Sequence, residues 1–474
     1  MRWLLAVLGV AAGAAAAALV YVLSTGSDEP VSLPQRAMPG RLLVGLQDDA
    51  TFRWASGRAE MLDLARNASV SVIRTTVVWS DVAAERPTQP SDPFDPAYEL
   101  DDVDDLVRSA QQRGIELLIT IWGTPGWANG GQAPNRAPRD PGDLEDFAAA
   151  LADRYSGRHP GYPAVRLFSA WNEPNLEQFL APQFDAAGQS VAPALYAPLA
   201  RAVHDGVKRA NADALVAVGE TSPRGHDRPS RGRVQESHSP ARFARLLSEE
   251  RPRIEFDAWA QHPYPPRAQV APAAGVRWPR VGLGNLERFG AVLDEWFDRE
   301  GTPLWITEYG HETLPAEPLG IDAALQARYA EEALDLAAGN ERIRMFLWFI
   351  FRDRDGNPWQ SGLLADDGLP KPALERFAEI ALRVDGRNPL VPEEAEAARV
   401  PALELAFHNP VGTPIEVSVE QEDEVAVVLE PDGWIDVPVD GRPGQVLDVR
   451  ATDPFGHSVS RTVRFGGNEL IELD

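Results

Sequence analysis

The 474-residue chain contains no cysteine, so it has no disulfide framework, no thiolate nucleophile and no cysteine-ligated zinc site. Basic residues are scarce relative to acidic ones: 45 Lys and Arg stand against 71 Asp and Glu, a net charge of −26. A protein this acidic repels polyanions, so nucleic acid is not expected as a partner. No internal repeat occurs either. What the chain does have is 44% apolar residues and 13 Trp, enough for a sizeable core.

One long uncharged run stands at the N-terminus. After Arg2, residues Trp3 to Leu23 carry no charge, and at ~1.5 Å per residue a helix of that length spans roughly 31 Å, about one hydrocarbon thickness. The end of the run is a poor small-x-small cleavage site, although the alanines before it offer weaker ones. An uncleaved signal anchor and a cleaved signal peptide therefore both stay open. Either one predicts export, to the cell surface with a membrane tether or to the extracellular space.

Composition divides the rest of the chain into two domains, since 474 residues exceed one typical domain. We expect a signal or anchor at 1–23, a linker at 24–39, a large domain at 40–385, a polar linker at 386–400 and a small domain at 401–474. The small domain has short Val- and Ile-rich runs separated by turn signals such as Asn409-Pro410 and Gly466-Gly467. This pattern predicts an immunoglobulin-like β-sandwich without its disulfide.

The large domain alternates short apolar runs with segments of helical periodicity. Eight strands are expected, at Leu42–Leu46, Val70–Val78, Ile115–Ile121, Ala164–Ala170, Ala214–Val218, Phe256–Gln261, Pro303–Thr307 and Ile343–Phe349. Helices are expected between them, at Asp101–Arg113, Asp143–Tyr155, Ala194–Ala210, Pro240–Glu249, Leu286–Arg299 and Asp322–Ala338, and after the last strand at Pro372–Leu382. Eight such repeats predict a (β/α)8 barrel. A doubly wound sheet is the competing fold, but no Gly-rich phosphate loop follows the first strand.

Two short stretches carry the chemistry. Each places a glutamate just after a strand-like apolar run: Glu173 in Trp171-Asn172-Glu173-Pro174-Asn175, and Glu308 in Trp305-Ile306-Thr307-Glu308-Tyr309-Gly310. They lie 135 residues apart, so only a fold that gathers distant strand ends brings them together. In a parallel barrel all strands end at one face. Two carboxylates facing each other across a cleft are the groups that cleave a glycosidic bond.

Further polar and aromatic residues fall in the expected strands or at their C-terminal ends, where barrel enzymes build their sites. In chain order the candidates are Arg74, Trp79, Trp122, Asn172, Glu173, Glu220, His262, Tyr264, Glu308 and Trp348. Taken together, the set resembles the retaining clan A glycoside hydrolases, over roughly Arg41 to Ala381. These enzymes carry an Asn-Glu pair after strand four and a glutamate after strand seven.

The resemblance implies a role for most of these residues. Glu173 would be the acid/base and Glu308 the nucleophile. Asn172 would bond the sugar 2-hydroxyl, while Arg74 and Tyr264 would hold and tune the nucleophile. His262 would lie beside them, Trp348 would form the floor under the cleaved sugar, and Trp79, Trp122 and Glu220 are further candidates for sugar contact.

Strand three departs from one pattern within the clan. Cellulase-type families carry a histidine near its end, whereas this chain reads Trp122-Gly123-Thr124-Pro125-Gly126-Trp127. That stretch is closer to family thirty-nine, the xylosidase and iduronidase group. The cellulase-type families are the second choice.

Each candidate also has a plain structural alternative. Arg74 could pair with a buried carboxylate, His262 could be a core histidine, and Trp79 and Trp122 could pack between barrel and helices. Trp305, within its strand, is expected in the core, and Glu220 could lie on the surface. Asp353–Asn357 resembles a calcium loop only faintly, because the distal glutamate is missing, so no metal is expected.

The loops after strands three, five, six and eight carry more arginines than acids. The arginines are Arg136, Arg139, Arg224, Arg228, Arg231, Arg233, Arg267, Arg277, Arg280, Arg352 and Arg354. A basic rim on an acidic protein suggests an anionic glycan, with solvated loops as the alternative.

The sequence thus predicts a cofactor-free retaining glycoside hydrolase that acts on an extracellular or cell-envelope polysaccharide or oligosaccharide. Two alternatives stay open: a non-catalytic glycan-binding protein of the cell envelope, and a transglycosylase that uses the same site.

Overall fold

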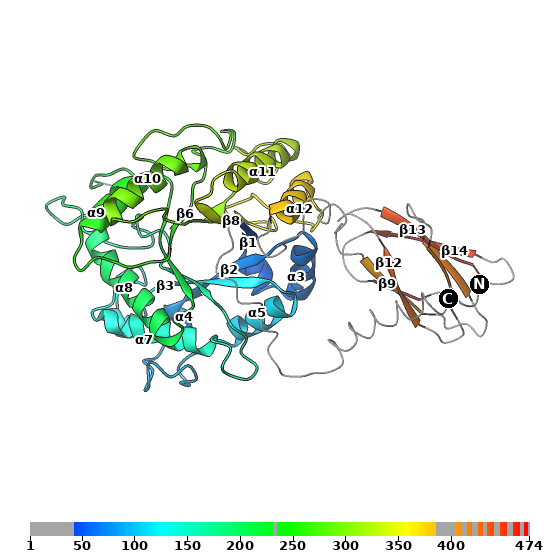
Figure 1. The fold of residues 1–474 in the computed structure, drawn as a ribbon, viewed down its shortest axis with the longest axis horizontal. Helices are drawn as coiled ribbons and strands as arrows, with labels where there is room; N and C mark the ends of the chain where they lie inside the picture. Colours follow the sequence, from blue (N-terminus) through cyan, green and yellow to red (C-terminus); the bar gives the residue numbers. More distant parts are fainter. Residues whose placement is uncertain are drawn as a thin grey trace.

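The computed structural model describes residues 42–230 and 235–384, and beyond them the backbone of strands between 403 and 472. Its main feature is a closed barrel in which the strands follow one another in chain order and neighbours pair in parallel (Figure 1). The strands are β1 (Leu43–Gln47), β2 (Val72–Val78), β3 (Glu116–Trp122), β4 (Leu167–Ala170), β5 (Leu215–Thr221), β6 (Ala258–Gln261), β7 (Leu304–Tyr309) and β8 (Ile343–Phe349). The predicted (β/α)8 barrel is confirmed.

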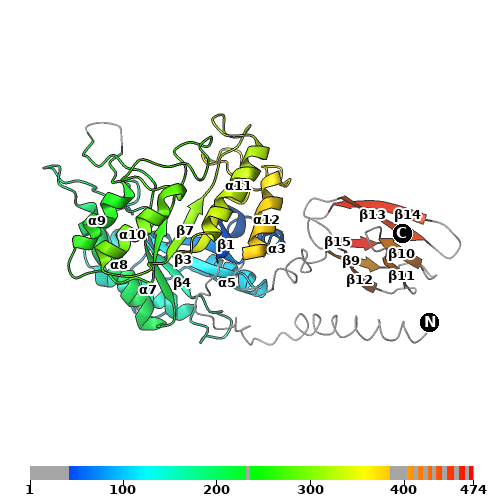
Figure 2. The ribbon, with the colours of Figure 1, turned by 45° about the horizontal axis from the view of Figure 1, so that its top comes forward.

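The helices form a ring around the strands (Figures 1 and 2). The longer ones are α3 (Arg58–Asn67), α5 (Asp101–Gln112), α7 (Pro141–Arg154), α8 (Ala192–Ala210), α9 (Pro240–Glu249), α10 (Leu286–Phe297), α11 (Ala323–Ala338) and α12 (Pro372–Val384). Short helical turns follow several strands: α2 (Asp49–Phe52), α4 (Trp79–Val82), α6 (Gly126–Asn129) and the 3-10 turn η1 (Leu283–Asn285). Helix α3 was not among the expected helices.

The strands pack against one hydrophobic cluster inside the barrel and another outside it, because each strand is covered on both faces. The cluster inside the barrel includes Leu43, Val72, Leu118, Trp305, Met345 and Leu347. The larger cluster lies between strands and helices, and it contains Ile73, Phe346 and Trp348. Trp305 is therefore core, as the sequence indicated. Alternate residues of one strand belong to opposite clusters, so side-chain direction follows the period of two.

Some strands begin later than expected, and β5 and β7 run on to Thr221 and Tyr309 instead of ending at Val218 and Thr307. Strand β4 begins at Leu167 rather than Ala164, and β6 begins at Ala258 rather than Phe256. In the first case the amide of Val165 donates to the carbonyl of Tyr155, at the end of α7, so this residue closes the preceding turn instead of pairing in the sheet.

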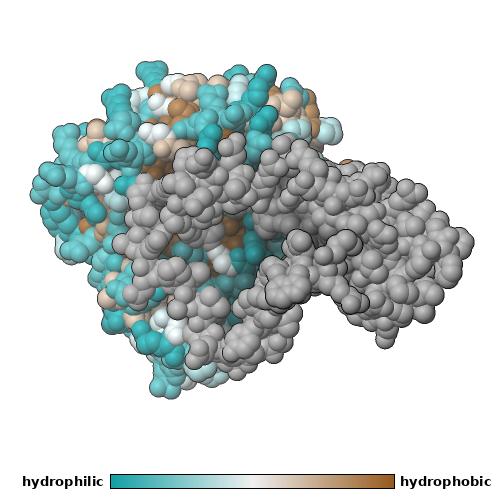
Figure 3. Space-filling model, turned by 45° about the vertical axis from the view of Figure 1, so that its right-hand side comes forward, coloured by the Kyte–Doolittle hydropathy of each residue, from teal (hydrophilic) through white to brown (hydrophobic). Residues whose placement is uncertain are grey.

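The face of the barrel domain in Figure 3 is mostly hydrophilic, with hydrophobic residues scattered among polar ones. Within the part of the chain that the structure describes, no helix is both long and apolar enough to cross a membrane. The predicted signal or anchor (1–23) and the linkers at 24–39 and 386–400 lie outside the described residues.

In the C-terminal region the strands form two sheets. One has the order β11-β10-β13-β14 and the other β12-β9-β15. Their bounds are β9 (Leu403–His408), β10 (Ile415–Val419), β11 (Val425–Leu429), β12 (Trp434–Val439), β13 (Val446–Thr452), β14 (Ser458–Arg464) and β15 (Glu469–Glu472). The immunoglobulin-like arrangement of this region stays a prediction.

Candidate active site

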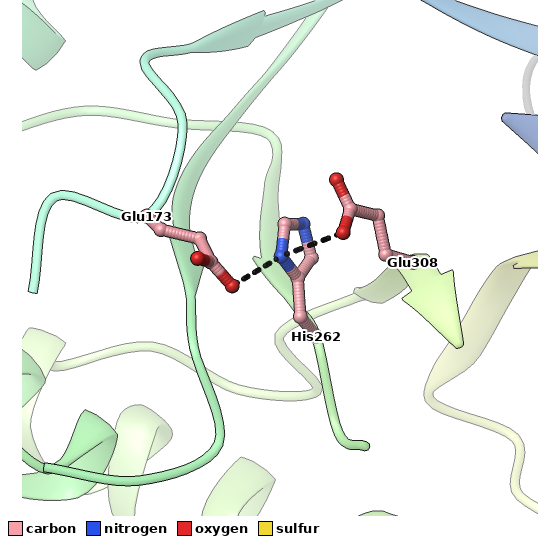
Figure 4. A group of neighbouring side chains, drawn as sticks. All are labelled: Glu173, His262 and Glu308. Atoms are coloured by element: carbon pink, nitrogen blue, oxygen red, sulfur yellow. Dashed lines mark hydrogen bonds and ion pairs between the residues drawn. The ribbon is translucent and has the colours of Figure 1, made fainter. Parts of the chain in front are cut away.

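The barrel brings Glu173 and Glu308 together at the C-terminal ends of its strands. Glu308 is the last but one residue of β7, and Glu173 lies in the turn after β4. One carboxylate oxygen of each, together with a ring nitrogen of His262, lie within 4.8 Å of one another (Figure 4). Two residues 135 positions apart in the sequence thus face each other.

His262 lies between the two carboxylates. Its Nδ1 is 3.0 Å from Glu173 Oε1 and 3.6 Å from Glu308 Oε2 (Figure 4). The ring is fully buried, and burial alone would lower the pKa of His262. The negative charge of Glu308 and the hydrogen bond to Glu173 outweigh that effect and raise the pKa above its ordinary value. The imidazole between the two acids therefore holds its proton more strongly than a free histidine does.

Arg74 of β2 organises the side of the site that holds Glu308. Its Nη1 donates to Glu308 Oε1 over 2.5 Å, and its Nη2 donates to Asn172 Oδ1 over 2.8 Å and to Glu220 Oε2 over 3.0 Å. Its Nε donates to Thr120 Oγ1 over 2.7 Å. Burial would lower the pKa of Arg74, but Glu220 and Glu308 raise it, so the guanidinium stays charged. The planar guanidinium of Arg74 thus fixes four side chains at once.

Glu308 is held in its ionised form. Burial would raise the pKa of this carboxyl, but the charges of His262 and Arg74, with hydrogen bonds from Arg74 and Tyr264, lower it below its ordinary value. The Tyr264 hydroxyl lies 3.0 Å from Glu308 Oε2. Burial and the charge of Glu308 raise the pKa of Tyr264 well above its usual value, so this hydroxyl remains a donor.

Glu308 owes its direction to an irregularity in β7. Trp305 faces the barrel interior, while Ile306 and Tyr309 belong to the outer cluster. In a regular strand one residue lies between two residues that face outward, but here two residues, Thr307 and Glu308, lie between Ile306 and Tyr309. The pairing of β7 with β8 shifts register at this point. A bulge of this kind re-aims side chains, and here it directs Glu308 toward Arg74.

Glu173 occupies a backbone conformation that non-glycine residues rarely adopt. Trp171 has φ 72° and Glu173 has φ 37°. Local hydrogen bonds hold the turn: the amide of Trp171 donates to the carbonyl of Ile121, and the amide of Glu173 donates to the carbonyl of Glu220. Asn175, fully buried, joins the same turn to the loop after β5. Strained backbone persists only where the surroundings hold it in this way.

The sequence model of the cellulase family, glycosyl hydrolase family 5, matches residues 42–351. The chain belongs to this family. It is a glycoside hydrolase, and it hydrolyses glycosidic bonds. The predicted clan is confirmed, and of the two families weighed from the sequence the matching model is the cellulase-type one.

Solved structures share the fold at low identity. A family 39 glycoside hydrolase from Bacteroides cellulosilyticus WH2 has a TM-score of 0.53 at 18% identity, over 86% of this chain and 81% of its own. A GH5_18 enzyme from Streptomyces cattleya, in complex with GlcNAc, has a TM-score of 0.53 at 17% identity, over 78% and 84%. A GH39 β-xylosidase from Caulobacter crescentus has a TM-score of 0.50 at 16% identity, over 86% and 96%. No curated protein matches the sequence.

Two tryptophans expected to contact sugar are core residues in this family 5 enzyme. Trp79 is fully buried and packs against Trp127 and Phe147. Trp348 is also fully buried, and its Nε1 donates to the carbonyl of Ser361 over 2.8 Å. The prediction of sugar contact is wrong for both, because neither ring has a surface that a ligand reaches.

The two expectations for Glu220, contact with sugar or a place on the surface, are also wrong. Its side chain is fully buried, and Oε2 accepts from Arg74. The other oxygen, Oε1, is buried without a hydrogen-bond partner among the described residues. Glu220 therefore acts on the site through Arg74 rather than on a ligand.

The other candidates are placed as the site requires. Arg74 and His262 are buried and contact the two glutamates. Asn172, Tyr264 and Trp122 are partly exposed, so a ligand can reach them. Trp122 closes β3, and its Nε1 donates to the carbonyl of Phe179 over 3.1 Å.

Two aromatic residues near Glu308 escaped the sequence analysis. Phe349, the last residue of β8, and Trp359 are both partly exposed. Trp359 packs edge-on against Tyr264 with ring centroids 4.9 Å apart, and lies 6.0 Å from Phe349. Alternation places Phe349 on the same face of β8 as Met345 and Leu347, and Trp348 on the opposite face, but only the packing shows that the first face is the barrel interior.

The three groups around His262 also have the spacing of metal ligands. A cation there would meet the guanidinium of Arg74, 2.5 Å from Glu308, and an imidazole that holds its own proton more strongly than a free histidine does. These charges disfavour a metal. At the faint calcium loop, Asp353 instead forms an ion pair with Lys371 and accepts from the amide of Gly362.

Proposed function

We propose that this glycoside hydrolase retains anomeric configuration, with Glu308 as nucleophile and Glu173 as acid/base. The separation of the two carboxylates supports the proposal, since their nearest oxygens lie within 4.8 Å. Retaining enzymes hold their carboxyl groups about 5–5.5 Å apart, whereas inverting enzymes leave about 6.5–9.5 Å for a water molecule. The gap here leaves no room for that water.

The environments of the two glutamates support the assignment of roles. Arg74, Tyr264 and His262 keep Glu308 ionised, which a nucleophile needs. Glu173 receives no guanidinium; among the described residues its carboxylate contacts His262 alone by an ion pair or hydrogen bond. An acid that must carry a proton is favoured by the absence of a permanent positive charge.

Two chemical steps follow from this assignment. In the first, Glu308 attacks the anomeric carbon, the glycosidic C–O bond breaks, and Glu173 gives its proton to the leaving oxygen. In the second, Glu173 takes a proton from water, which attacks the same carbon and releases Glu308. His262, between the carboxylates, balances their charge as the proton on Glu173 leaves and returns.

We propose that partly exposed aromatic residues on both sides of the carboxylates hold the sugar. Trp122 and Phe179 lie on the acid/base side, with ring centroids 5.6 Å apart. Tyr264, Trp359 and Phe349 lie on the nucleophile side. The amide oxygen of Asn172 accepts a hydrogen bond from Arg74, so its amide nitrogen can donate to a hydroxyl of the sugar ring.

The substrate that we propose is an extracellular or cell-envelope polysaccharide or oligosaccharide, reached after export through the N-terminal segment. Anionic glycans are one class within it. Arg224, Arg228, Arg267, Arg277 and Arg280 are exposed, whereas Arg354 is paired with Asp48. Arg231 and Arg233 lie outside the described residues. Cell fractionation tests the export, and activity on uronate-bearing against neutral polymers at two salt concentrations tests the charge preference.

We also propose that the strands of the C-terminal region form an immunoglobulin-like sandwich that supports the barrel or spaces it from the membrane. A purely glycan-binding protein is disfavoured, because the two glutamates, Asn172 and Tyr264 are all present. Transfer to a sugar acceptor uses the same residues, and differs in how well water is excluded. Comparing hydrolysis and transfer products separates the two.

Mutation of the carboxylates tests the mechanism. Glu308→Gln should abolish turnover, and a 2-fluoro glycosyl fluoride should leave a covalent adduct on Glu308 of the wild type, seen by mass spectrometry. Glu312→Gln, in the loop after β7, is the matched control and should keep activity. Proton NMR of the first product should show the anomer of the substrate. Release of the opposite anomer would sink the double displacement.

A further inference from the structure

A buried polar network lies behind the turn that carries Glu173. Residues 235–239 run alongside residues 175–177, with an antiparallel bridge between Leu176 and Ser237. The amide of His238 donates to the carbonyl of Asn175 over 2.8 Å, and Asn175 Nδ2 donates back to the carbonyl of His238 over 2.8 Å. The loop after β5 thus holds the chain directly behind the acid/base residue.

The side chain of His238 extends this network. The ring is fully buried and stacks on Phe184 with centroids 4.4 Å apart. Its Nδ1 is 2.8 Å from Gln183 Oε1, and its Nε2 is 2.7 Å from Ser190 Oγ. Gln183, also fully buried, donates its Nε2 to the carbonyls of Pro174, over 2.9 Å, and Leu180, over 2.7 Å. Pro174 is the residue that follows Glu173.

These contacts fix the direction of every hydrogen bond. Gln183 Nε2 faces two carbonyl oxygens, so its amide oxygen must face the imidazole. That oxygen only accepts, so the proton of His238 is on Nδ1. The ring Nε2 then accepts from the Ser190 hydroxyl. Rotating the Gln183 amide would turn its oxygen toward the carbonyls of Pro174 and Leu180 and take away their donor, which is costly.

The imidazole stays neutral near pH 7. Burial lowers the pKa of His238 to about 4, although the charge of Asp227 acts in the opposite direction. Such a weak base is poorly suited to activate the Ser190 hydroxyl as a nucleophile, despite the short contact. The geometry instead suits a fixed link between two loops.

We infer that His238 is a positioning residue for Glu173: through Gln183 it fixes the Pro174 carbonyl, and with it the strained backbone that aims the acid/base carboxylate. This inference rests on the proposed role of Glu173. The link joins elements 55 residues apart between His238 and Gln183. Among the described residues, no hydrogen bond joins His238, Gln183 or Ser190 to Arg74, Tyr264 or Glu308, so we expect the link to affect protonation of the leaving group more than nucleophilic attack.

Leaving-group dependence separates this role from a merely structural one. A 2,4-dinitrophenyl leaving group departs without protonation, whereas phenoxide needs the acid. We compare kcat/KM for 2,4-dinitrophenyl and phenyl β-glycosides of glucose, xylose, cellobiose and xylobiose, using the pair that the wild type cleaves fastest. His238→Ala should lower kcat/KM about 10- to 100-fold for the phenyl glycoside, since a carboxylate displaced by about 1 Å loses that much. It should change the dinitrophenyl value less than about 3-fold.

Two conservative variants test the two ring nitrogens of His238 separately. In His238→Asn the amide nitrogen takes the place of Nδ1 and still donates to Gln183, so activity on the phenyl glycoside should return. In His238→Gln the amide reaches the place of Nε2 and meets Ser190, so activity should stay low. Ser190→Ala removes the far end of the link and should leave the ratio of the two substrates unchanged. If His238→Ala does not fold, as its Tm would show, the Asn and Gln pair carries the test.

Several outcomes would overturn the inference. Equal losses on both substrates in His238→Ala, or equal activities of His238→Asn and His238→Gln, would make the role structural. Glu173→Gln is the reference variant, because removal of the acid itself must lower kcat/KM for the phenyl glycoside and not for the dinitrophenyl glycoside. Its failure to discriminate, or no cleavage of any pair by the wild type, would contradict the proposed function and not the link alone. Nitrogen-15 NMR of labelled histidine tests the link without turnover, and the Nε2–H tautomer at His238 would refute it.

Discussion

Arg74 and Glu308 are 234 residues apart in the sequence, yet Nη1 of the first donates to Oε1 of the second over 2.5 Å. Arg74 is the third residue of β2, and Glu308 is the last but one residue of β7. The contact gives Glu308 a permanently charged, hydrogen-bonded partner, whereas Glu173 is hydrogen-bonded to His262, whose ring can lose its charge. The chemical difference between two identical side chains therefore comes from which strand ends surround each of them.

Replacing Arg74 tests this difference. In Arg74→Lys a single ammonium cannot reach Glu308, Asn172 and Glu220 together, so we expect kcat/KM to fall at least about 100-fold, from hydrogen bonds to charged groups of about 1.5–3 kcal/mol each. The pKa of Glu308 should rise, and the acid limb of kcat/KM should move to higher pH. Arg154→Lys is the matched control, a buried arginine paired with Asp104; it should lower Tm and leave the limb in place. An unmoved limb in Arg74→Lys would contradict the role of Arg74.

Tyr264→Phe removes one hydrogen bond from Glu308 and little volume. The hydroxyl lies 3.0 Å from Glu308 Oε2, so we expect kcat to fall about 10- to 100-fold, with a smaller upward shift of the acid limb than in Arg74→Lys. Steady-state kinetics across pH measures both effects. Tyr155→Phe, which removes a hydroxyl bonded to Asp104, should affect stability alone. Equal kinetic losses in the two variants would argue against a specific function of Tyr264.

Trp359 is expected to contact the sugar, because its ring is partly exposed and packs against Tyr264. Aromatic stacking contributes about 0.5–1.5 kcal/mol beyond buried area, so Trp359→Ala should raise KM several-fold to about 10-fold. Trp296→Ala, on the outer helix α10, removes a similarly half-buried indole and should leave KM unchanged. A KM unaltered by Trp359→Ala would place this ring outside the binding site.

Stability should decline in mild acid through buried neutral histidines. Burial lowers the pKa of His311 to about 4, although a hydrogen bond to the carbonyl of Ala268 opposes this. The unfolded chain binds a proton near pH 6.5 and the folded one near pH 4, so stability is full above pH 6.5 and is lost as pH falls toward 4. His311→Asn should remove about 2–3 kcal/mol of that pH dependence at pH 4.5. Urea unfolding of the wild type and of His311→Asn at pH 7 and 4.5 measures this difference. The same loss of stability between the two pH values in both proteins would contradict the prediction.

The elements of the barrel could be predicted because each repeats a short pattern. Apolar runs of strand length alternate with helical periodicity, and turn residues separate them, so the order of strands follows from the chain alone. The glutamates at two strand ends could be identified for the same reason. Start positions were less certain: β4 begins at Leu167 because Val165 bonds to the end of α7.

What each side chain near the site does was decided by tertiary structure. The strands are covered on both faces, so their residues are apolar on both sides and the inward face cannot be read from hydrophobicity. That is why Trp348 lies in the outer core while Phe349 takes the position near the site. The bulge that turns Glu308 inward depends on pairing with β8, and the link from His238 to Gln183 joins loops 55 residues apart. The sequence by itself determined the barrel and its pair of acids. Only the packing of distant strands and loops decided which neighbours hold each acid, because electrostatic and hydrogen-bond contacts act over distances in space and not along the chain.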